Sequence, residues 1–161
     1  MKAEFRALGV PRSQRGRIGD ETLEFLQRCF ADDVVESNGQ EFLFRPRPKR
    51  PPIYVGGAAP HALVRAARYA DGWMPMGGDP AALREPIARL HELARESGRG
   101  TPAVVLLTSF DVREPAEAKD RVAALAEVGV TGIVAGSRYT DTGEFTRGVD
   151  FLAEHLMPEL A

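Results

Sequence analysis

Two adjacent glycines, Gly56 and Gly57, stand where a short apolar run meets a helical pattern, in the segment PIYVGGAAPHALVRAARYA. Glycine has no side chain to block close approach of the backbone, and Pro60 suits the first turn of a helix. Backbone amides at such a turn, with the positive end of the helix dipole, favour a phosphate. The turn carries no Lys or Arg, so the backbone would do the binding. The motif alone favours a simpler interpretation, a tight turn without a ligand.

Trp73 and Met74 follow Gly72 at the expected end of a strand, where they would line a substrate pocket or pack in the core. Core packing is the slightly better interpretation, because Trp is commonly buried for its area. Arg15 and Arg17 are candidates for gripping an anionic substrate or cofactor tail, although a solvated loop explains them more simply.

No metal site and no nucleophile is predicted. The lone cysteine, Cys29, stands beside Phe30 on an amphipathic pattern and is expected to be a small core residue. Ser109 and Ser137 lack the strand-turn-helix motif of a hydrolase nucleophile. The three histidines lie in predicted helices without a second ligand at metal-binding spacing, and they are His61, His91 and His155.

Composition excludes several classes of function. The formal charge of −2 comes from 21 basic and 23 acidic residues along the chain, so nucleic acid and membrane surfaces are not expected partners. A single cysteine fits a reducing compartment, and the first residues lack the apolar core of a secretory signal. We therefore expect a cytoplasmic protein with one domain, since 161 residues leave no room for a second.

The first third of the chain is expected to hold a helix, a hairpin and a connector. Asp20 is an acceptable N-cap for a helix that ends near Asp33, with Leu23, Leu26 and Phe30 on one face. Asn38-Gly39 predicts a hairpin turn between two short extended runs. The proline- and cation-rich run RPRPKRPP (45–52) predicts an extended, solvated connector rather than a nucleic-acid patch, because aromatic partners for bases are missing.

Four strand-then-helix units follow, each with a short apolar run and then a longer segment of helical period. The expected strands are 53–55, 72–75, 104–110 and 132–135, and the expected helices are 61–70, 80–97, 115–128 and 145–157.

Several residues predict how these helices begin, end and pack. Asp79-Pro80 should start the second helix and Gly98 should stop it, while Pro86 predicts a kink or a delayed start. Asp141 and Glu144 have the spacing of a capping box, in which each side chain bonds a backbone amide. The inward-facing residues of the second and third helices should be Leu83, Ile87, Leu90, Leu93, Ala118, Val122 and Leu125.

Repeated strand-helix alternation indicates an α/β fold with a parallel sheet, because parallel strands need crossover connections that helices supply. Four units cannot close an eight-stranded barrel. The pattern reads like the second half of a larger fold.

The segments PPIYVGGAAPHALVRAARYADGWMP (51–75) and EFRALGVPRSQRGRIGDETLEFLQRCF (4–30) resemble the luciferase-like monooxygenase family, which includes deazaflavin-dependent oxidoreductases. The resemblance extends over essentially the whole chain. It includes the Gly-containing hairpin, the Pro-rich run, the AARYADGW passage and the closing GVTGIVAG strand.

The resemblance implies a partial TIM-type barrel, in which this chain forms the C-terminal half of an eight-stranded (β/α) barrel. It covers residues 1–161, with the helix, hairpin and connector in 1–52 and the four βα units in 53–161. It also implies a cofactor, FMN or coenzyme F-420, whose phosphate contacts Gly56, Gly57, Ala58 and Ala59. The family's loops that handle protons lie in the half without a counterpart here, so no catalytic residue is assigned.

Two functions follow as expectations. The first is a flavin- or F-420-dependent oxidoreductase or monooxygenase acting on an unknown small molecule, in which the chain is a truncated product, has a misplaced start or is half of a split barrel. The second is a non-catalytic assembly module, whose open sheet edges pair with a second copy or with a complementary barrel half.

Overall fold

A computed structural model describes residues 2–160 of the chain and the side chains of residues 2–158. The chain forms two compact units, which divide between Pro52 and Ile53.

The first unit contains a short helix α1 (Lys2–Ala7), a 3-10 turn η1 (Arg12–Gln14), a long helix α2 (Arg15–Ala31) and a hairpin. The hairpin pairs β1 (Val34–Ser37) with β2 (Gln40–Leu43) in antiparallel register. Its turn residues Asn38 and Gly39 have φ of 53° and 76°, and positive values at both positions match a two-residue hairpin turn. The predicted hairpin is confirmed.

Helix α2 begins earlier than predicted, at Arg15, so that Asp20 lies inside the helix and is not its N-cap. The 3-10 turn η1 leads directly into the helix. The guanidinium group of Arg17 lies 2.6 Å from Glu21 Oε1 and 3.0 Å from Gln14 Oε1, so local contacts stabilise the first turn without a capping side chain. Cys29 is buried, as expected of a small core residue.

The Pro-rich connector is irregular, as predicted, but two of its cations are not simply solvated. Both Arg45 and Arg47 form ion pairs with Asp33. Arg47 Nη1 also donates to the carbonyl oxygen of Phe30 at 3.1 Å, which satisfies an end group of helix α2. The hydrogen bond from Arg45 and the two positive charges lower the pKa of Asp33. These contacts attach the connector to the end of its own helix.

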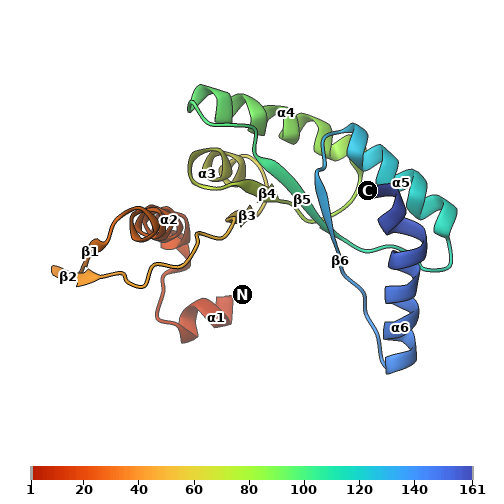
Figure 1. Cartoon of the computed structure of the whole chain (residues 1–161), viewed down its shortest axis with the longest axis horizontal. Coiled ribbons are helices and arrows are strands. Elements are labelled where there is room, and N and C mark those ends of the chain that lie inside the picture. The colour runs from red at the N-terminus through yellow and green to blue at the C-terminus, as the bar shows by residue number, and fades with distance from the viewer. Residues whose placement is uncertain (1, 161) are drawn as a thin grey trace. The chain divides into compact units, whose positions relative to one another are not determined.

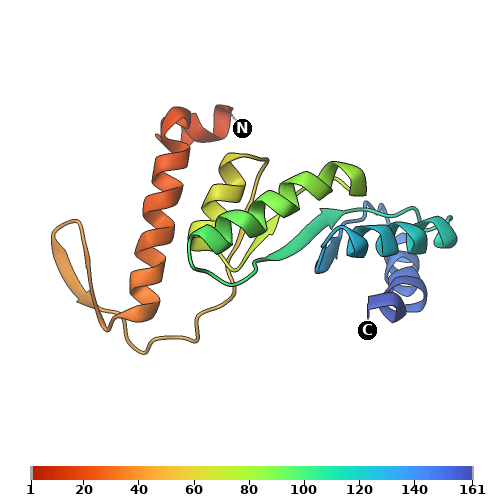
Figure 2. The same cartoon turned by 90° about the horizontal axis from the view of Figure 1, so that it is seen from above.

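The second unit is a parallel sheet of four strands in the order β3-β4-β5-β6. Helices connect consecutive strands, and α3, α4 and α5 lie along one face of the sheet (Figures 1 and 2). The expected α/β fold with a parallel sheet is therefore confirmed. The strands are β3 (Tyr54–Gly56), β4 (Gly72–Met74), β5 (Ala103–Thr108) and β6 (Gly132–Ala135), and the helices are α3 (His61–Tyr69), α4 (Pro80–Glu96), α5 (Pro115–Glu127) and α6 (Thr142–Phe151).

The core of this unit lies between the sheet and its helices. Along β5, Val104, Leu106 and Thr108 are buried while the residues between them are half-buried, because successive side chains of a strand point to opposite faces. The predicted inward-facing residues of α4 and α5 are buried, except that Leu93 is half-buried. The helical period therefore identified the correct faces.

Where β4 begins, Asp71 forms hydrogen bonds at the beginning of both neighbouring strands, and Gly72 allows these strands to pack closely. The Asp71 carboxylate accepts from the Ile53 amide at 2.7 Å, and its carbonyl accepts from the Ala103 amide at 2.9 Å. Gly72 has no room for a side chain, since a Cβ there would come 2.5 Å from the Ala103 carbonyl oxygen and 2.7 Å from the Tyr54 ring.

Helix α4 confirms two of its three predicted features. The Asp79 side chain caps the helix by accepting from the Ala81 amide at 3.0 Å, and Gly98 follows the helix end with φ of 66°. Of the two effects predicted for Pro86, the delayed start is wrong, because the helix begins at Pro80 and contains Pro86. The kink stays a prediction. The Asp79 cap and a proline in the first turn fix the start ahead of Pro86.

Helix α6 starts at Thr142, before the expected Phe145, because Asp141 caps it and accepts from the Glu144 amide at 2.8 Å. The capping box is only half formed. The Glu144 carboxylate accepts from the amide and hydroxyl of Thr140, at 2.7 and 2.9 Å, and not from the Asp141 amide. The expected single helix also changes to a π-helical turn, η2 (Leu152–Leu156), and a 3-10 turn, η3 (Met157–Leu160). Within residues 2–160, no helix has the length and apolar character needed to cross a membrane.

Candidate functional site

The carboxyl ends of parallel strands meet at one edge of the sheet, and the loops at this edge carry the candidate site. The glycine turn follows β3 at this edge. Gly57 has φ of 118°, a left-handed backbone conformation that residues other than glycine rarely adopt. A Cβ at Gly57 would approach the Ala62 side chain to 3.4 Å. The turn thus requires glycine for its backbone conformation, as the sequence indicated.

The amides of this turn are available to a ligand. Residues 56–60 are exposed, and the first amides with helical partners are those of Ala62 and Val64, which donate to Ala58 and Pro60. In the described part of the chain, the amides of Gly57, Ala58 and Ala59 have no hydrogen bond. They lie ahead of α3, whose N-terminal end has a partial positive charge. This arrangement can bind an anion through the backbone.

The side chain of Trp73 contacts the glycine turn. Its side chain is buried, and the indole Nε1 donates to the carbonyl oxygen of Gly57 at 2.9 Å. Of the two interpretations of Trp73, core packing is the one that its burial matches. Met74 is the half-buried last residue of β4, beside Gly56 in the strand register.

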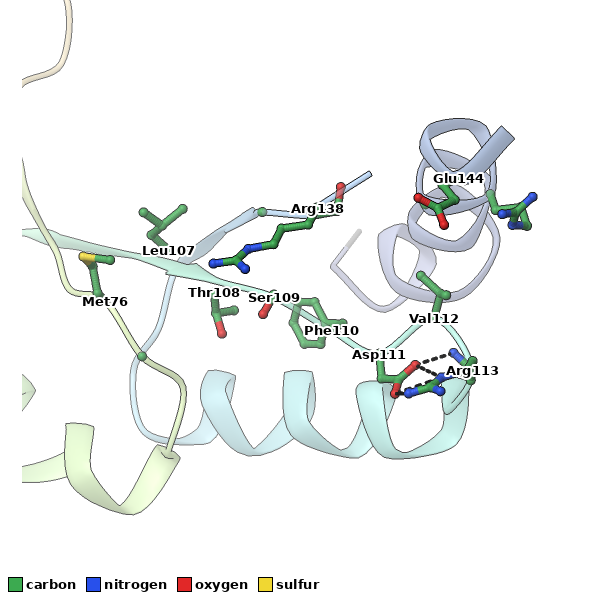
Figure 3. Close-up of a pocket in the computed structure, with 15 residues that line it drawn as sticks. Met76, Leu107, Thr108, Ser109, Phe110, Asp111, Val112, Arg113, Arg138 and Glu144 are labelled. Carbon is green, nitrogen blue, oxygen red and sulfur yellow. Dashed lines mark hydrogen bonds and ion pairs between the residues drawn. The ribbon is translucent and has the colours of Figure 1, made fainter. Parts of the chain in front are cut away.

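A second feature of the same edge is an open cavity of about 1180 Å³ at the ends of β5 and β6. Its lining comes from the loop after β4, the segments after β5 and β6, and the first turns of α6, as Figure 3 shows. Polar groups from Ser109, Ser137 and Arg138 border it, together with apolar surface from Leu107 and Phe110. Active sites of α/β barrels lie at this end of the strands.

Arg121 of α5 fixes two of the loops that border the cavity. Its Nε donates to the Gly78 carbonyl at 3.0 Å, its Nη1 to the Ser109 carbonyl at 3.1 Å, and its Nη2 to Thr108 Oγ1 at 2.7 Å. Its guanidinium carbon also lies 5.3 Å from the centre of the Phe110 ring. A Cβ at Gly78 would collide with this guanidinium group. Arg121 is therefore a positioning residue that joins the loop after β4 to the loop after β5.

The carboxylates of the cavity are held in their charged form. Arg113 donates through its side chain and its amide to Asp111, which lowers the Asp111 pKa to about 2. The amide and hydroxyl of Thr140, with the nearby charge of Arg147, lower the pKa of Glu144. Neither carboxylate therefore carries a proton near neutral pH, so neither is suited to act as a general acid there.

The other predicted site residues belong to the first unit. Arg15 and Arg17 belong to α2 in the first unit, where Arg15 donates to the Arg12 carbonyl at 3.0 Å and Arg17 contacts Glu21 and Gln14. Their role with an anionic ligand stays a prediction. Across residues 2–160, the structure brings together no group of three or more His, Cys, Asp or Glu side chains that could hold a metal.

Sequence reasoning missed Arg121, Gly78 and the cavity. One signal was present, because Gly77-Gly78 and Gly136 each follow a strand or its bridge at the carboxyl end, as Gly56-Gly57 do. Glycines at this position mark loops where a backbone approaches a neighbour or a ligand closely. The partner of Gly78 gave no such signal, since Arg121 lies on a different helix.

Comparison with known proteins identifies the family. A family model described as luciferase-like monooxygenase matches residues 1–156. Uncharacterized proteins of Mycobacterium tuberculosis and Mycobacterium bovis are 38% identical over 141 residues, which cover 84% of this chain and 47% of theirs. The chain therefore spans about half the length of the relatives it matches.

Solved structures show the same fold at low sequence identity. An F-420-dependent secondary alcohol dehydrogenase aligns with a TM-score of 0.75 and 15% identity, over 93% of this chain and 63% of that one. A monooxygenase from Streptomyces bottropensis has a TM-score of 0.75 and 18% identity, over 99% and 66%. An F-420-dependent tetrahydromethanopterin reductase from Methanopyrus kandleri has a TM-score of 0.66 and 13% identity, over 100% and 72%. Because the family model matches nearly the whole length of this chain, the chain belongs to the luciferase-like monooxygenase family.

Proposed function

We propose that this chain supplies the cofactor-phosphate end of an oxidoreductase or monooxygenase that uses coenzyme F-420 or FMN. The observation that carries the proposal is the exposed turn from Gly56 to Ala59, in which the amides of Gly57, Ala58 and Ala59 have no hydrogen bond within the described residues. It lies at the carboxyl end of a parallel strand in a chain of this family. A single buried cysteine fits a cytoplasmic location for such an enzyme.

The residues of the turn fit a phosphate. Amides at the start of α3 would orient it, Gly57 would let it approach the backbone, and Trp73 would hold the Gly57 carbonyl in place. The bound cofactor would supply the hydride or oxygen chemistry. The protein would then fix its position, with Met74 beside the turn.

We further propose that the four strands belong to an eight-stranded barrel whose other strands lie outside this chain. In the sheet order, β3 and β6 each have a neighbour on one side only. Tyr54 on β3 is 40% exposed and Val134 on β6 is 44% exposed, and closure of the sheet into a barrel would remove both open edges. The missing strands would also provide the residues that handle protons.

Titration of the purified chain with FMN and with F-420 tests the cofactor proposal, with calorimetry as the readout. The informative variant is Gly57→Ala, because alanine resists a φ of 118° and adds a Cβ near Ala62. The matched control is Gly100→Ala, since a Cβ there meets nothing within 4 Å. We expect Gly57→Ala to weaken binding about tenfold, which corresponds to about 1.4 kcal/mol, and the control to leave it within about twofold.

Absence of binding at millimolar cofactor, or equal affinities of the two glycine variants, would contradict the proposal for this chain. F-420 is the first cofactor to test, because two of the structural neighbours are named as F-420-dependent enzymes. The comparison of the two titrations decides between F-420 and FMN.

A second candidate function is an assembly module that pairs its open sheet edges with a second copy or with a complementary barrel half. The exposed edge strands β3 and β6 favour it. Sedimentation over a range of concentrations should reveal association, and Val134→Lys should reduce it by placing a charge on the β6 edge. A strictly monomeric chain with β3 and β6 amides protected from hydrogen exchange would exclude this candidate.

A further inference from the structure

The cavity at the ends of β5 and β6 has a pattern of charge that the phosphate turn does not explain. Three arginines and two carboxylates line it, Arg113, Arg138, Arg147, Asp111 and Glu144, which gives a net charge of +1. Arg113 is paired with Asp111, and Arg147 faces Glu144. The remaining cation is Arg138.

Arg138 is free to bind an anion. In the described residues its guanidinium group has no hydrogen bond or ion pair. Figure 3 shows its side chain extending from the segment after β6 back into the cavity, toward the end of β5. Ser109 and Ser137, which are exposed and line the same cavity, would add hydroxyl donors. A guanidinium group with two hydroxyl groups is suited to a carboxylate or a phosphate.

The cavity also presents apolar surface to its ligand. Met76 is 80% exposed and Val112 is 44% exposed, and both line the cavity together with Phe110 and Leu107. Apolar side chains gathered around a few polar groups are typical of small-molecule sites. A ligand that uses the whole cavity would therefore have an apolar body and an anionic group.

This anion would be separate from the cofactor phosphate. The turn at Gly56–Ala59 follows β3 and Arg138 follows β6, at opposite ends of the sheet order. Neighbouring strands lie about 4.8 Å apart, so the two positions are separated by about 14 Å along the edge. One phosphate cannot contact both.

We propose that this cavity binds a small molecule that carries a carboxylate or phosphate group, with the anion on Arg138 and the apolar part against Phe110 and Val112. The proposal rests on the proposed function and deepens it, because it names an acidic compound as the ligand beside the cofactor. The anionic group has two sources to distinguish, the substrate itself and an acidic tail of the cofactor.

Benzoate and phenyl phosphate are the probes, and benzamide is their uncharged counterpart. Binding is followed by NMR, from the amide signals of Ser109 and Ser137 for the cavity and from those of Gly57 and His61 for the turn. The variant is Arg138→Gln, and the matched control is Arg84→Gln, which removes an exposed arginine of α4 outside the cavity lining. Arg138→Lys keeps the charge and shows whether the affinity for the anionic probes depends on the charge or on the shape of the guanidinium group.

We expect benzoate and phenyl phosphate to move the signals of Ser109 and Ser137, and Arg138→Gln to weaken their binding about tenfold. Arg84→Gln should leave binding within about twofold, and Arg138→Gln should not change benzamide binding. Equal binding of the anions to the wild type and Arg138→Gln would overturn the proposal, as would shifts confined to Gly57 and His61.

The same variants separate the two sources and the two proposals. If Arg138→Gln weakens the binding of F-420 but not that of FMN, the anion is the acidic tail of the cofactor. If it weakens the binding of benzoate alone, the anion belongs to the substrate. Loss of FMN binding in Gly57→Ala with unchanged benzoate binding would confirm that the two sites are independent. Benzoate binding without any cofactor binding would refute the proposed function and leave the acid site standing.

Discussion

The indole nitrogen of Trp73 lies 2.9 Å from the carbonyl oxygen of Gly57 and donates a hydrogen bond to it. The bond joins a buried side chain of β4 to an exposed turn that follows the neighbouring strand β3. A carbonyl held in this way fixes the peptide plane of Gly57, and with it the direction of the next amide. The conformation of the phosphate turn therefore depends on a core residue.

Substitution of Trp73 by phenylalanine should loosen the turn and weaken cofactor binding. We expect a loss of about 1 to 2 kcal/mol in the free energy of unfolding, from the lost hydrogen bond and the lost buried area. Cofactor affinity should fall as well, which urea denaturation and calorimetry measure separately.

The control for this prediction is Leu90→Ala, which opens a cavity at a fully buried position of α4 away from the turn. It should cost about 2 to 5 kcal/mol of stability without changing cofactor affinity. If both variants lower the affinity equally, the effect of Trp73→Phe comes from stability alone.

The bond between Arg121 and the Gly78 carbonyl leads to a second prediction. A Cβ at Gly78 would occupy the place of the Arg121 guanidinium group. Gly78→Ala should therefore cost about 2 kcal/mol in the wild type, because hydrogen bonds from a charged donor are lost. In an Arg121→Ala background, the same substitution should cost much less.

Urea denaturation of the two single variants and the double variant measures this coupling. Contacting residues give non-additive changes of about 0.5 to 3 kcal/mol, whereas independent residues give additive ones. Additive losses would show that Arg121 and Gly78 act separately. Arg84→Ala, on the exposed face of α4, serves as the control for removing an arginine.

Local sequence patterns predicted most of the second unit. The spacing of Leu83, Ile87 and Leu90 identified the buried face of α4, and Asp79 identified its start. In the first unit, the hairpin followed from Asn38-Gly39 between two short extended runs, because few residue pairs accept positive φ at both turn positions. These features depend on residues that are close in sequence.

The features that were missed depend on contacts between distant residues. Arg121 and Gly78 are 43 positions apart, and only the parallel pairing of β4 and β5 brings their loops together. The early start of α2 had no capping signal, and the ion pairs of Arg45 and Arg47 with Asp33 required the connector to fold back on its helix. Sequence spacing carries little information about such contacts.

Gly72 provides a third prediction, at the beginning of β4. The Ala103 carbonyl and the Tyr54 ring leave no room for a Cβ at this position. Because the carbonyl belongs to the backbone of β5, it cannot move aside without disturbing the strand pairing. Gly72→Ala should therefore lower the free energy of unfolding by about 3 kcal/mol. Gly100→Ala should change the free energy of unfolding by less than about 0.5 kcal/mol. Similar losses in the two variants would contradict the claim that a Cβ does not fit at Gly72.

The Asp111–Arg113 pair predicts how acid affects stability. The hydrogen bonds and charge of Arg113 lower the Asp111 pKa from 3.8 to about 2, so the folded state favours the carboxylate. The stabilisation from this group is therefore present above pH 3.8 and is lost as the pH falls toward 2. Between these values, Asp111→Asn should lose less stability than the wild type, as urea denaturation at each pH would show. Asp150→Asn, which removes an exposed carboxylate of α6, should follow the wild type. Parallel pH curves for all three proteins would mean that Arg113 does not hold Asp111 in solution.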